Sequence, residues 1–295
     1  MRHFILGTDW WTDCDDAVAI RMLARAHKSG AICLDGVVIN ACMEDSVASL
    51  DGFLTLEGCE NIPLGLDAEA TDFGGKPPYQ KRLAPFAGRY KSNADAEDAV
   101  KLYRRLLAEA KAPVEMVEIG YLQAFAALLD SEADEISPKT GLALVKEKVS
   151  KCWVMAGKWD ADGEKENNFC RNGRSRLAGA AFCEKCPVPV TFLGWEVGFD
   201  VISGGALSHE DYLWQALADH GSPEGRSSWD PMLVLLALTG DEERAGYTAV
   251  YGDARVNAQT GQNYFTPQDG GRHAYVVKAK ENAYYEDLIN QSIAN

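Results

Sequence analysis

The chain has 295 residues, of which 46% are hydrophobic and 25% are charged, so it can bury a large core as one large or two smaller α/β domains. Its 29 basic and 44 acidic residues give a net charge of −15, which argues against a nucleic acid or an anionic membrane as a partner, because both bind basic surfaces. No apolar run approaches the roughly 20 residues that span a bilayer, and we expect neither a membrane span nor a signal peptide.

Apolar runs of strand length alternate with helical patterns, which is typical of βαβ units and a mostly parallel sheet. We expect strands at residues 3–8, 33–40, 62–66, 114–119, 149–155 and 188–193, and an edge strand at 272–277. We expect helices at residues 15–29, 45–57, 94–110, 124–129 and 174–183, and another that begins at Asp230. Residues 71–88 are rich in Gly and Pro and are expected to form a loop across a site. No repeat or linker is visible, which predicts a single domain over residues 1–295.

Eight cysteines are spread through the chain, several of them inside apolar runs. A buried reduced thiol behaves as a small hydrophobe, so we expect a reducing, cytoplasmic compartment. Cys183 and Cys186 form one C-x-x-C pair. A lone pair is only a weak indication of zinc or redox chemistry.

Four carboxylates lie within eight residues directly after the first expected strand: Asp9, Asp13, Asp15 and Asp16. Like charges this close raise one another's pKa, and Ca²⁺, which takes about six to eight oxygen ligands, would relieve the repulsion. The carboxyl ends of strands in open α/β sheets are also where ligands bind. Helix capping accounts for one or two of these carboxylates but not for Asp9, which precedes the helix. We therefore expect a metal or catalytic site here.

This stretch resembles the N-terminal signature of the nucleoside hydrolases, which are calcium-dependent N-ribohydrolases: an Asp, a short Gly-containing turn, then Asp-Asp-Ala before a helix. Here the turn is longer, which leaves Asp13 as an extra carboxylate with a supporting or capping role, and Trp10-Trp11 stands where the family often has Pro-Gly. The resemblance implies an open, mostly parallel α/β sheet flanked by helices, with a Rossmann-like core and the site at the carboxyl ends of the strands.

Two later segments are similar to the family's sugar-binding motifs. Asn40 ends the second expected strand, where the family has an Asn that contacts ribose, although Asn is also common in turns. Glu166-Asn167-Asn168 resembles the family's Glu-Phe-Asn, which implies that Glu166 and Asn168 hydrogen-bond the sugar hydroxyls. The alternative for this segment is a solvated polar loop.

Two more segments match the family's calcium ligands. Gly120-Tyr121-Leu122-Gln123-Ala124 stands where the family has Gly-Pro-Leu-Thr-Asn, which implies that Gln123 offers its backbone carbonyl to the metal, unless this is an ordinary strand-to-helix turn. Asp230 precedes an apolar helix and resembles the Asp of the family's His-Asp pair, although an Asp before Pro can also be a helix cap. The resemblance implies that Asp9, Asp16, Gln123 and Asp230 together hold Ca²⁺.

Trp229 departs from the family pattern, because the members that cleave pyrimidine nucleosides and inosine have a His there as a candidate acid for the leaving base. An indole cannot act as a general acid at neutral pH, and no histidine of this chain occupies the corresponding place. Trp10, Trp11 and Trp229 offer flat faces that suit a purine, and stacking on aromatics contributes about 1 to 3 kcal/mol per base. Each of these tryptophans could equally pack in the core.

The resemblance implies calcium-dependent hydrolysis of the N-glycosidic bond of a ribonucleoside, which gives free base and ribose. Asp9 would act as general base toward a metal-activated water, and the transition state would resemble an oxocarbenium ion. The sugar would be held by Asp15, Asn40, Glu166 and Asn168. The resemblance also implies a homo-oligomer, either a dimer or a tetramer.

Two other functions are alternatives to this one. A phosphatase or transferase of the haloacid dehalogenase type also places an Asp after its first strand, but it needs Asp-x-Asp, and Asp9-Trp10-Trp11 lacks the second Asp. A non-catalytic nucleoside or sugar binder that kept the calcium pocket is the alternative that the missing His supports.

Overall fold

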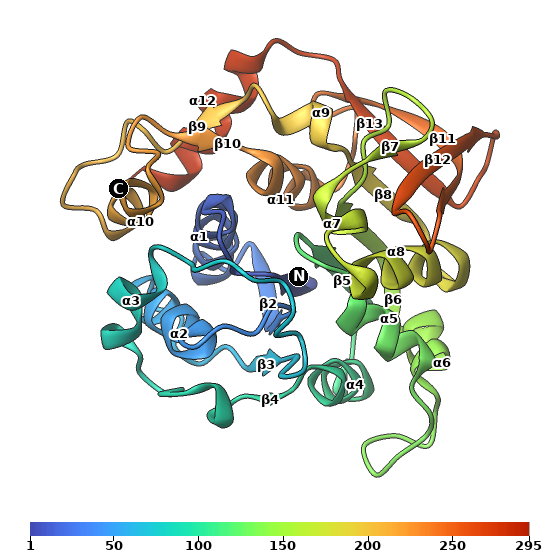
Figure 1. Cartoon of the computed structure of the whole chain (residues 1–295), viewed down its shortest axis with the longest axis horizontal. Coiled ribbons are helices and arrows are strands. Elements are labelled where there is room, and N and C mark those ends of the chain that lie inside the picture. Colours follow the sequence, from blue (N-terminus) through green and yellow to red (C-terminus); the bar gives the residue numbers. More distant parts are fainter. Residues whose placement is uncertain (295) are drawn as a thin grey trace.

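The computed structural model describes residues 1–294 (Figure 1). Its strands are β1 (Arg2–Thr8), β2 (Ile32–Ile39), β3 (Leu64–Leu66), β4 (Glu97–Asp98), β5 (Val114–Glu118), β6 (Val149–Met155), β7 (Glu164–Lys165), β8 (Val190–Leu193), β9 (Ile202–Ser203), β10 (Arg226–Ser227), β11 (Tyr247–Val256), β12 (Gln262–Pro267) and β13 (His273–Lys278). Its α-helices are α1 (Asp15–Lys28), α2 (Ser46–Leu56), α3 (Gln80–Leu83), α4 (Ala99–Glu109), α5 (Gln123–Asp130), α6 (Gly141–Lys148), α7 (Asn167–Cys170), α8 (Gly173–Lys185), α9 (Trp195–Gly198), α10 (Tyr212–His220), α11 (Trp229–Thr239) and α12 (Asn282–Ile293), with short 3₁₀ helices η1 (Ala84–Phe86) and η2 (Asn93–Asp95). None of the helices within residues 1–294 combines the length and the apolar character that crossing a bilayer requires.

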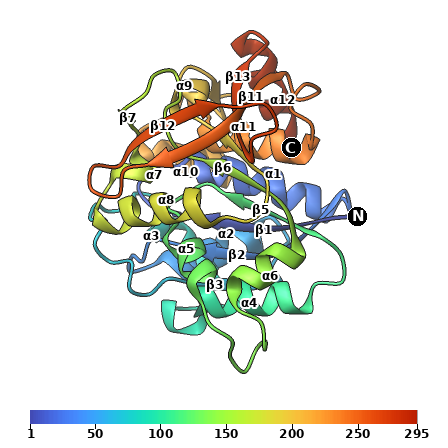
Figure 2. The same ribbon diagram turned by 90° about the vertical axis from the view of Figure 1, so that its right-hand side faces the viewer.

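Eleven strands form one sheet in the order β4-β3-β2-β1-β5-β6-β8-β13-β11-β12-β7, and β9 pairs with β10 separately. The strands from β4 to β13 run parallel, whereas β13, β11, β12 and β7 pair antiparallel. Figure 2 shows this antiparallel part at one end of the molecule and β3 with α4 toward the other. Because the chain leaves β1 toward β4 on one side and returns to β5 on the other, the strand order reverses between β1 and β5. Ligands of open α/β sheets bind at the carboxyl ends of strands at such a point.

Helices cover both faces of the sheet. Successive side chains of a strand point to opposite faces, so the side chains on both faces are buried. From β1, Phe4 and Leu6 join a core with α1, α2, α11 and α12, whereas Ile5 joins a second core with α4, α5, α6 and α8. Figure 1 shows α1 beside α11, and α5, α6 and α8 grouped apart from them. The two cores hold the central strands rigidly, and their carboxyl ends are therefore a fixed platform for side chains.

Three expectations from the sequence are wrong in detail. The strand at residues 272–277 is not at an edge, because β13 lies between β8 and β11 in the interior of the sheet. The helix expected at residues 94–110 begins at Ala99, where the Asp98 side chain caps it by accepting a hydrogen bond from the Lys101 backbone N–H. The segment 71–88 is not all loop, because it contains α3 and η1.

Glu118, the last residue of β5, is a buried acid whose charge we expect to lower stability. It is 0% exposed, only one carboxylate oxygen accepts a hydrogen bond, at 2.9 Å from the Tyr103 hydroxyl, and Oε2 has no partner within residues 1–294. Burial raises the pKa of Glu118 from 4.5 to about 8. Between these two pH values the folded protein keeps a proton that the unfolded chain has lost, so the free energy of unfolding falls as pH rises.

As pH rises from 5 to 9, ionisation of Glu118 is expected to lower the free energy of unfolding by up to about 5 kcal/mol, at about 1.36 kcal/mol per pKa unit. In Glu118→Gln this decrease should be absent. Urea unfolding at several pH values measures this difference. The control is Glu135→Gln, because the Glu135 side chain is 75% exposed. If Glu118→Gln and Glu135→Gln keep the same pH dependence as the unchanged protein, the charge on Glu118 does not limit stability.

Candidate active site

A strained turn directly after β1 places Asp9. Trp10 has φ of 44°, and it is the only residue other than Gly with a positive φ within residues 1–294. Such a conformation costs about 1 to 3 kcal/mol and persists where neighbouring contacts impose it. Here the Trp10 N–H donates to the Thr8 hydroxyl oxygen at 3.1 Å, and the Gln80 side-chain amide donates to the Trp10 carbonyl at 2.6 Å. The turn therefore fixes the Asp9 carboxylate at the carboxyl end of β1.

Three further carboxylates meet where α1 and α11 pack against each other. Asp15 and Asp16 begin α1, Asp230 lies in the first turn of α11, and one carboxylate oxygen from each lies within 4.8 Å of the others. The Asp230 N–H donates to Asp15 Oδ2 at 3.1 Å, and the Thr8 hydroxyl donates to Asp16 Oδ1. Asp9 adjoins this group, because its carboxyl shares a hydrogen bond with Asp16.

The four carboxylates form an acidic cluster whose charge the protein does not compensate. Asp9, Asp15, Asp16 and Asp230 are all buried, and within residues 1–294 no Lys or Arg side chain forms an ion pair with any of them. Burial and the neighbouring carboxylates raise the pKa of Asp9, Asp15 and Asp230 well above the usual range, and burial raises that of Asp16 to about 6. Oxygen ligands without a counter-charge suit a hard divalent cation such as Ca²⁺, so these residues fit a calcium site.

The acidic cluster opens on a cavity of about 200 Å³. Facing it are Met155, Glu166 and Asn168, together with Trp195 and Trp229. Met155 ends β6, Glu166 caps α7 and Asn168 lies within α7. The two tryptophans begin α9 and α11. The cavity therefore has an acidic floor, a polar wall and an aromatic wall.

The polar wall is held by backbone groups. Glu166 caps α7, with Oε1 accepting from the Asn168 N–H at 2.8 Å and Oε2 accepting from the Gly157 N–H at 2.9 Å. Burial raises the pKa of Glu166 to about 7. The Asn168 side-chain amide donates to the Met155 carbonyl at 2.9 Å. Both side chains are thus locked in position and keep further polar atoms for a ligand in the cavity.

The aromatic wall consists of stacked rings. The Trp195 and Trp229 rings lie 6.3 Å apart at 29°, and the Phe199 ring stacks on Trp195 at 4.4 Å and lies 6.4 Å from Trp229. The Trp229 indole N–H donates to the Trp195 carbonyl at 2.7 Å. Because its N–H is taken, Trp229 can offer the cavity an aromatic surface but no hydrogen-bond donor.

Solved structures of similar shape identify this fold. A plant nucleoside hydrolase aligns at a TM-score of 0.74 and 16% identity, over 99% of this chain and 98% of that chain. An inosine-uridine preferring nucleoside hydrolase from Bacillus anthracis gives 0.72 and 15%, over 99% of both chains. A purine-preferring ribonucleoside hydrolase from Gardnerella vaginalis gives 0.71 and 16%, over 99% of this chain and 98% of that chain.

The chain has the nucleoside hydrolase fold. The predicted class, a mostly parallel sheet flanked by helices, is confirmed. No protein-family model matches the chain, and no curated protein matches it either. The likeness therefore lies in the shape of the backbone, and the chemistry of the site depends on the residues of this chain.

Within the nucleoside hydrolase fold, the extra carboxylate of this chain is neutralised. Asp13 accepts two hydrogen bonds from the Arg226 guanidinium, at 2.8 and 2.6 Å, and one from the Cys14 N–H at 2.7 Å. Burial opposes the charge on Asp13, but Arg226 outweighs it and holds the pKa of Asp13 below its usual value. His220 Nε2 lies 3.8 Å from Asp13 Oδ1. Asp13 thus has partners that the acidic cluster lacks.

Two of the three tryptophans expected at the base do not line the cavity. Trp10 is 0% exposed, packs against Phe53 and Tyr79, and donates its indole N–H to Ser49 Oγ at 2.8 Å. Trp11 packs against Tyr121 and Phe73 under the guanidinium of Arg171. Trp10 is therefore a core residue, whereas Trp229 lines the cavity, and its contact with a base stays a prediction. Trp195 was not predicted from the sequence as a residue of the site. Its place just after the end of β8 could have indicated it, because ligands bind at the carboxyl ends of the strands.

Asn40 and Gln123 contact each other just beyond the ends of β2 and β5. Asn40 Oδ1 accepts from the Tyr121 N–H at 3.0 Å, the Gln123 side-chain amide donates to the Asn40 carbonyl, and Asn40 Nδ2 has no partner within residues 1–294. A Cβ on Gly120 would lie 2.3 Å from the Asp9 nitrogen and 2.7 Å from Asn40 Oδ1, so the ends of β1, β2 and β5 converge. Neither Asn40 nor Gln123 lines the cavity, and their ribose and calcium roles stay predictions.

The C-x-x-C pair does not form a metal site. Cys186 Sγ lies 3.9 Å from Cys152 Sγ on β6, and both are buried. Within residues 1–294, no group of metal-ligating side chains includes Cys183. All eight cysteines are free thiols.

The uncompensated charge of the acidic cluster predicts that calcium stabilises the fold. Adding Ca²⁺ is expected to raise the melting temperature and a chelator to lower it, because an ion that binds only the folded state contributes about 2.7 kcal/mol at one hundred times its Kd. Thermal unfolding measured at several Ca²⁺ concentrations tests this. In Asp230→Asn the calcium-dependent shift should shrink strongly, whereas in Asp219→Asn, a surface control, it should be unchanged. A melting temperature that changes with neither Ca²⁺ nor chelator would contradict the calcium site.

Proposed function

We propose that the protein is an N-glycosyl hydrolase that cleaves ribonucleosides to free base and ribose with the help of Ca²⁺. The observation that carries this proposal is the buried acidic cluster, which lacks a cationic partner and faces Glu166 and Asn168 across the cavity. It lies in the nucleoside hydrolase fold, at the carboxyl end of the central strand. A sugar hydroxyl needs oxygen and amide partners of this kind, and a flat base suits the aromatic wall.

Calcium would be held by carboxylates of Asp9, Asp16 and Asp230, with the carbonyl of Gln123 as a further predicted ligand. When bound, the ion supplies positive charge that neutralises the cluster and makes water easier to deprotonate. Asp15, which accepts the Asp230 N–H, would orient the sugar from the same floor.

Asp9 would take the proton from the attacking water as general base. The water oxygen forms a bond to the anomeric carbon as the N-glycosidic bond breaks, and the electron pair of that bond leaves with the base through an oxocarbenium-like transition state. Glu166 and Asn168 would hold the sugar hydroxyls from the opposite wall, and Asn40 is a further predicted contact of the ribose. The departing base would take its proton from solvent, since the described cavity lining includes no His.

A second candidate function is a nucleoside or sugar binder without catalysis. It is favoured by one observation, the Trp229 indole N–H that is bonded to the Trp195 carbonyl instead of being free to serve a leaving base. Calcium binding does not separate the two functions, because a binder would keep the same metal. Turnover separates them.

The test is release of reducing sugar from a panel of purine and pyrimidine ribosides, with calcium and with chelator. The hydrolase predicts calcium-dependent release from at least one riboside, and much slower release from the matched 2′-deoxyriboside, since the sugar hydroxyls are predicted contacts and this analogue lacks one of them. If ribosides bind and none releases sugar, the binder replaces the hydrolase.

Two other parts of the proposal rest on the sequence alone. The homo-oligomer, a dimer or tetramer, follows from the family resemblance, and the cytoplasmic location follows from the cysteine pattern. Both stay predictions.

A further inference from the structure

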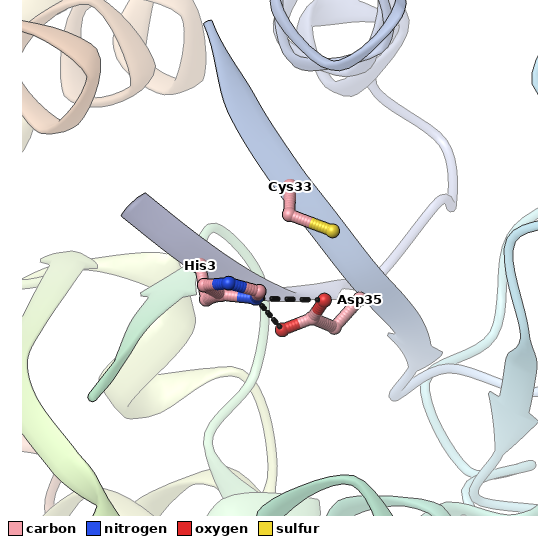
Figure 3. A group of neighbouring side chains, drawn as sticks. All are labelled: His3, Cys33 and Asp35. Carbon is pink, nitrogen blue, oxygen red and sulfur yellow. Dashed lines mark hydrogen bonds and ion pairs between the residues drawn. The ribbon is translucent and has the colours of Figure 1, made fainter. Parts of the chain in front are cut away.

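A second group of metal-ligating side chains lies at the end of β1 opposite to the acidic cluster. It consists of His3 on β1 with Cys33 and Asp35 on β2 (Figure 3), and one ligand atom from each lies within 4.8 Å of the others. The side chains of His3 and Asp35 are 32% and 23% exposed, so solvent reaches them. Asp9 is six residues beyond His3, which is about 20 Å along an extended strand.

An irregularity in the pairing of β1 and β2 assembles this group. His3 pairs with Cys33 and Phe4 with Leu34, but Ile5 pairs with Gly36, so Asp35 is an extra residue on β2. Such a bulge redirects a side chain. Here it brings the Asp35 carboxylate back beside β1, where both of its oxygens contact His3 Nδ1, at 3.0 and 3.1 Å.

The partners of Asp35 are groups that a metal ion can replace or share. Within residues 1–294 Asp35 forms an ion pair with His3, and no Lys or Arg is paired with it. The Cys33 thiol lies within 4.8 Å of a carboxylate oxygen of Asp35. Thiolate, imidazole and carboxylate are the ligands of zinc sites, whereas Ca²⁺ and Mg²⁺ take oxygen ligands. This donor set therefore differs in kind from the acidic cluster.

We propose that His3, Cys33 and Asp35 bind a divalent transition-metal ion of the zinc class, separately from the proposed calcium site. Three protein ligands leave a fourth position for water, which the exposure of the group allows. Binding replaces the proton of the Cys33 thiol, which passes to solvent, while neutral His3 keeps its proton on the nitrogen that does not bind. The ion links β1 to β2 at the amino end of the sheet and stabilises their pairing.

The mixed group of Asp13, Cys14 and His220 also brings three potential ligands within 4.8 Å, but it is a weaker candidate. Its carboxylate is already held by two hydrogen bonds from Arg226, and its thiol is fully buried. It therefore serves as the control.

The experiment is titration of the full-length, reduced protein with Co²⁺ in the presence of saturating Ca²⁺, followed by the sulfur-to-cobalt charge-transfer absorption. A saturable band at one equivalent, displaced by Zn²⁺, is expected. Cys33→Ser should abolish the band, and His3→Gln and Asp35→Asn, which keep the thiol, should weaken Co²⁺ binding by at least about tenfold. Cys14→Ser and Cys170→Ser, a partly exposed cysteine elsewhere, should leave the band unchanged.

Three results would overturn the proposal. These are no saturable band in the unchanged protein, a band that persists in Cys33→Ser, or a band that is lost in Cys14→Ser. If Cys33→Ser does not fold, His3→Gln and Asp35→Asn decide, and unaltered Co²⁺ affinity in both overturns the site. None of these readouts depends on turnover, so they are independent of the proposed hydrolase.

Discussion

Asp9→Asn is expected to lower kcat for the best riboside by about 10² to 10⁴-fold, which is the usual contribution of a positioned general base. Asparagine has nearly the same shape and keeps an oxygen that can face a metal, but it cannot accept a proton from water. The strained turn at Trp10 is held by Thr8 and Gln80, so the backbone should keep its position. Steady-state kinetics at saturating Ca²⁺, with Ca²⁺ affinity measured by calorimetry, separates loss of the base from loss of the metal.

The matched comparison is Asp13→Asn, which changes an acid on the same loop. Asp13 is already neutralised by Arg226, so its loss should reduce kcat far less than the loss of Asp9. The assignment of the base fails if Asp9→Asn keeps more than about a tenth of kcat with calcium bound. Equal losses in both variants would also contradict it, because they would indicate a general effect of charge in the loop.

Arg21→Ala is expected to lower the free energy of unfolding by about 3 to 5 kcal/mol, because it removes the buried guanidinium that bonds the buried carboxylates of Asp211 and Glu57. The Arg21 side chain is 1% exposed, and its guanidinium donates to both oxygens of Asp211 at 2.7 Å and to Glu57 Oε1 at 2.5 Å. It also lies over the Tyr212 ring. These contacts join α1 to α2 and α10, so the loss should appear as lower stability of the whole fold in urea unfolding.

Arg82→Ala is the control for burial. Arg82 also donates two hydrogen bonds to one carboxylate, that of Asp219, but the two side chains are 44% and 23% exposed. An exposed pair contributes about 0 to 1 kcal/mol. Similar losses in Arg21→Ala and Arg82→Ala would show that burial does not determine the contribution of these pairs.

Most of the fold and part of the site could be predicted from local patterns in the sequence. The runs that became β1, β2, β5 and β6 are apolar because both faces of a parallel sheet are covered, and this is visible in short windows of sequence. The carboxylates at residues 9–16 stood out for a similar reason, because their charge density is local. Asp230 was found through its motif, and the structure places it beside Asp15 and Asp16.

The remaining errors concern pairings between distant segments. Arg272 to Val277 carries no local sign that β8 and β11 will flank it, so its interior position was missed. Trp10 and Trp229 are the same residue type after similar polar residues, yet one points into the core and the other into the cavity. That difference depends on the positive φ at Trp10 and on the packing of α9 against α11, neither of which is encoded in a short window.

Asp230 lies 214 positions after Asp16 in the chain, and this separation matters during synthesis on the ribosome. At about 5 to 20 residues per second, the acidic loop emerges roughly 10 to 40 seconds before its last carboxylate partner. Over that interval its side chains are hydrated, and β1 gains β2 and then β5 as neighbours. The complete set of carboxylates exists only after α11 packs on α1. Binding of the proposed calcium ion would therefore be a late step in the maturation of the nascent chain, and the amino-terminal half would begin to fold without it.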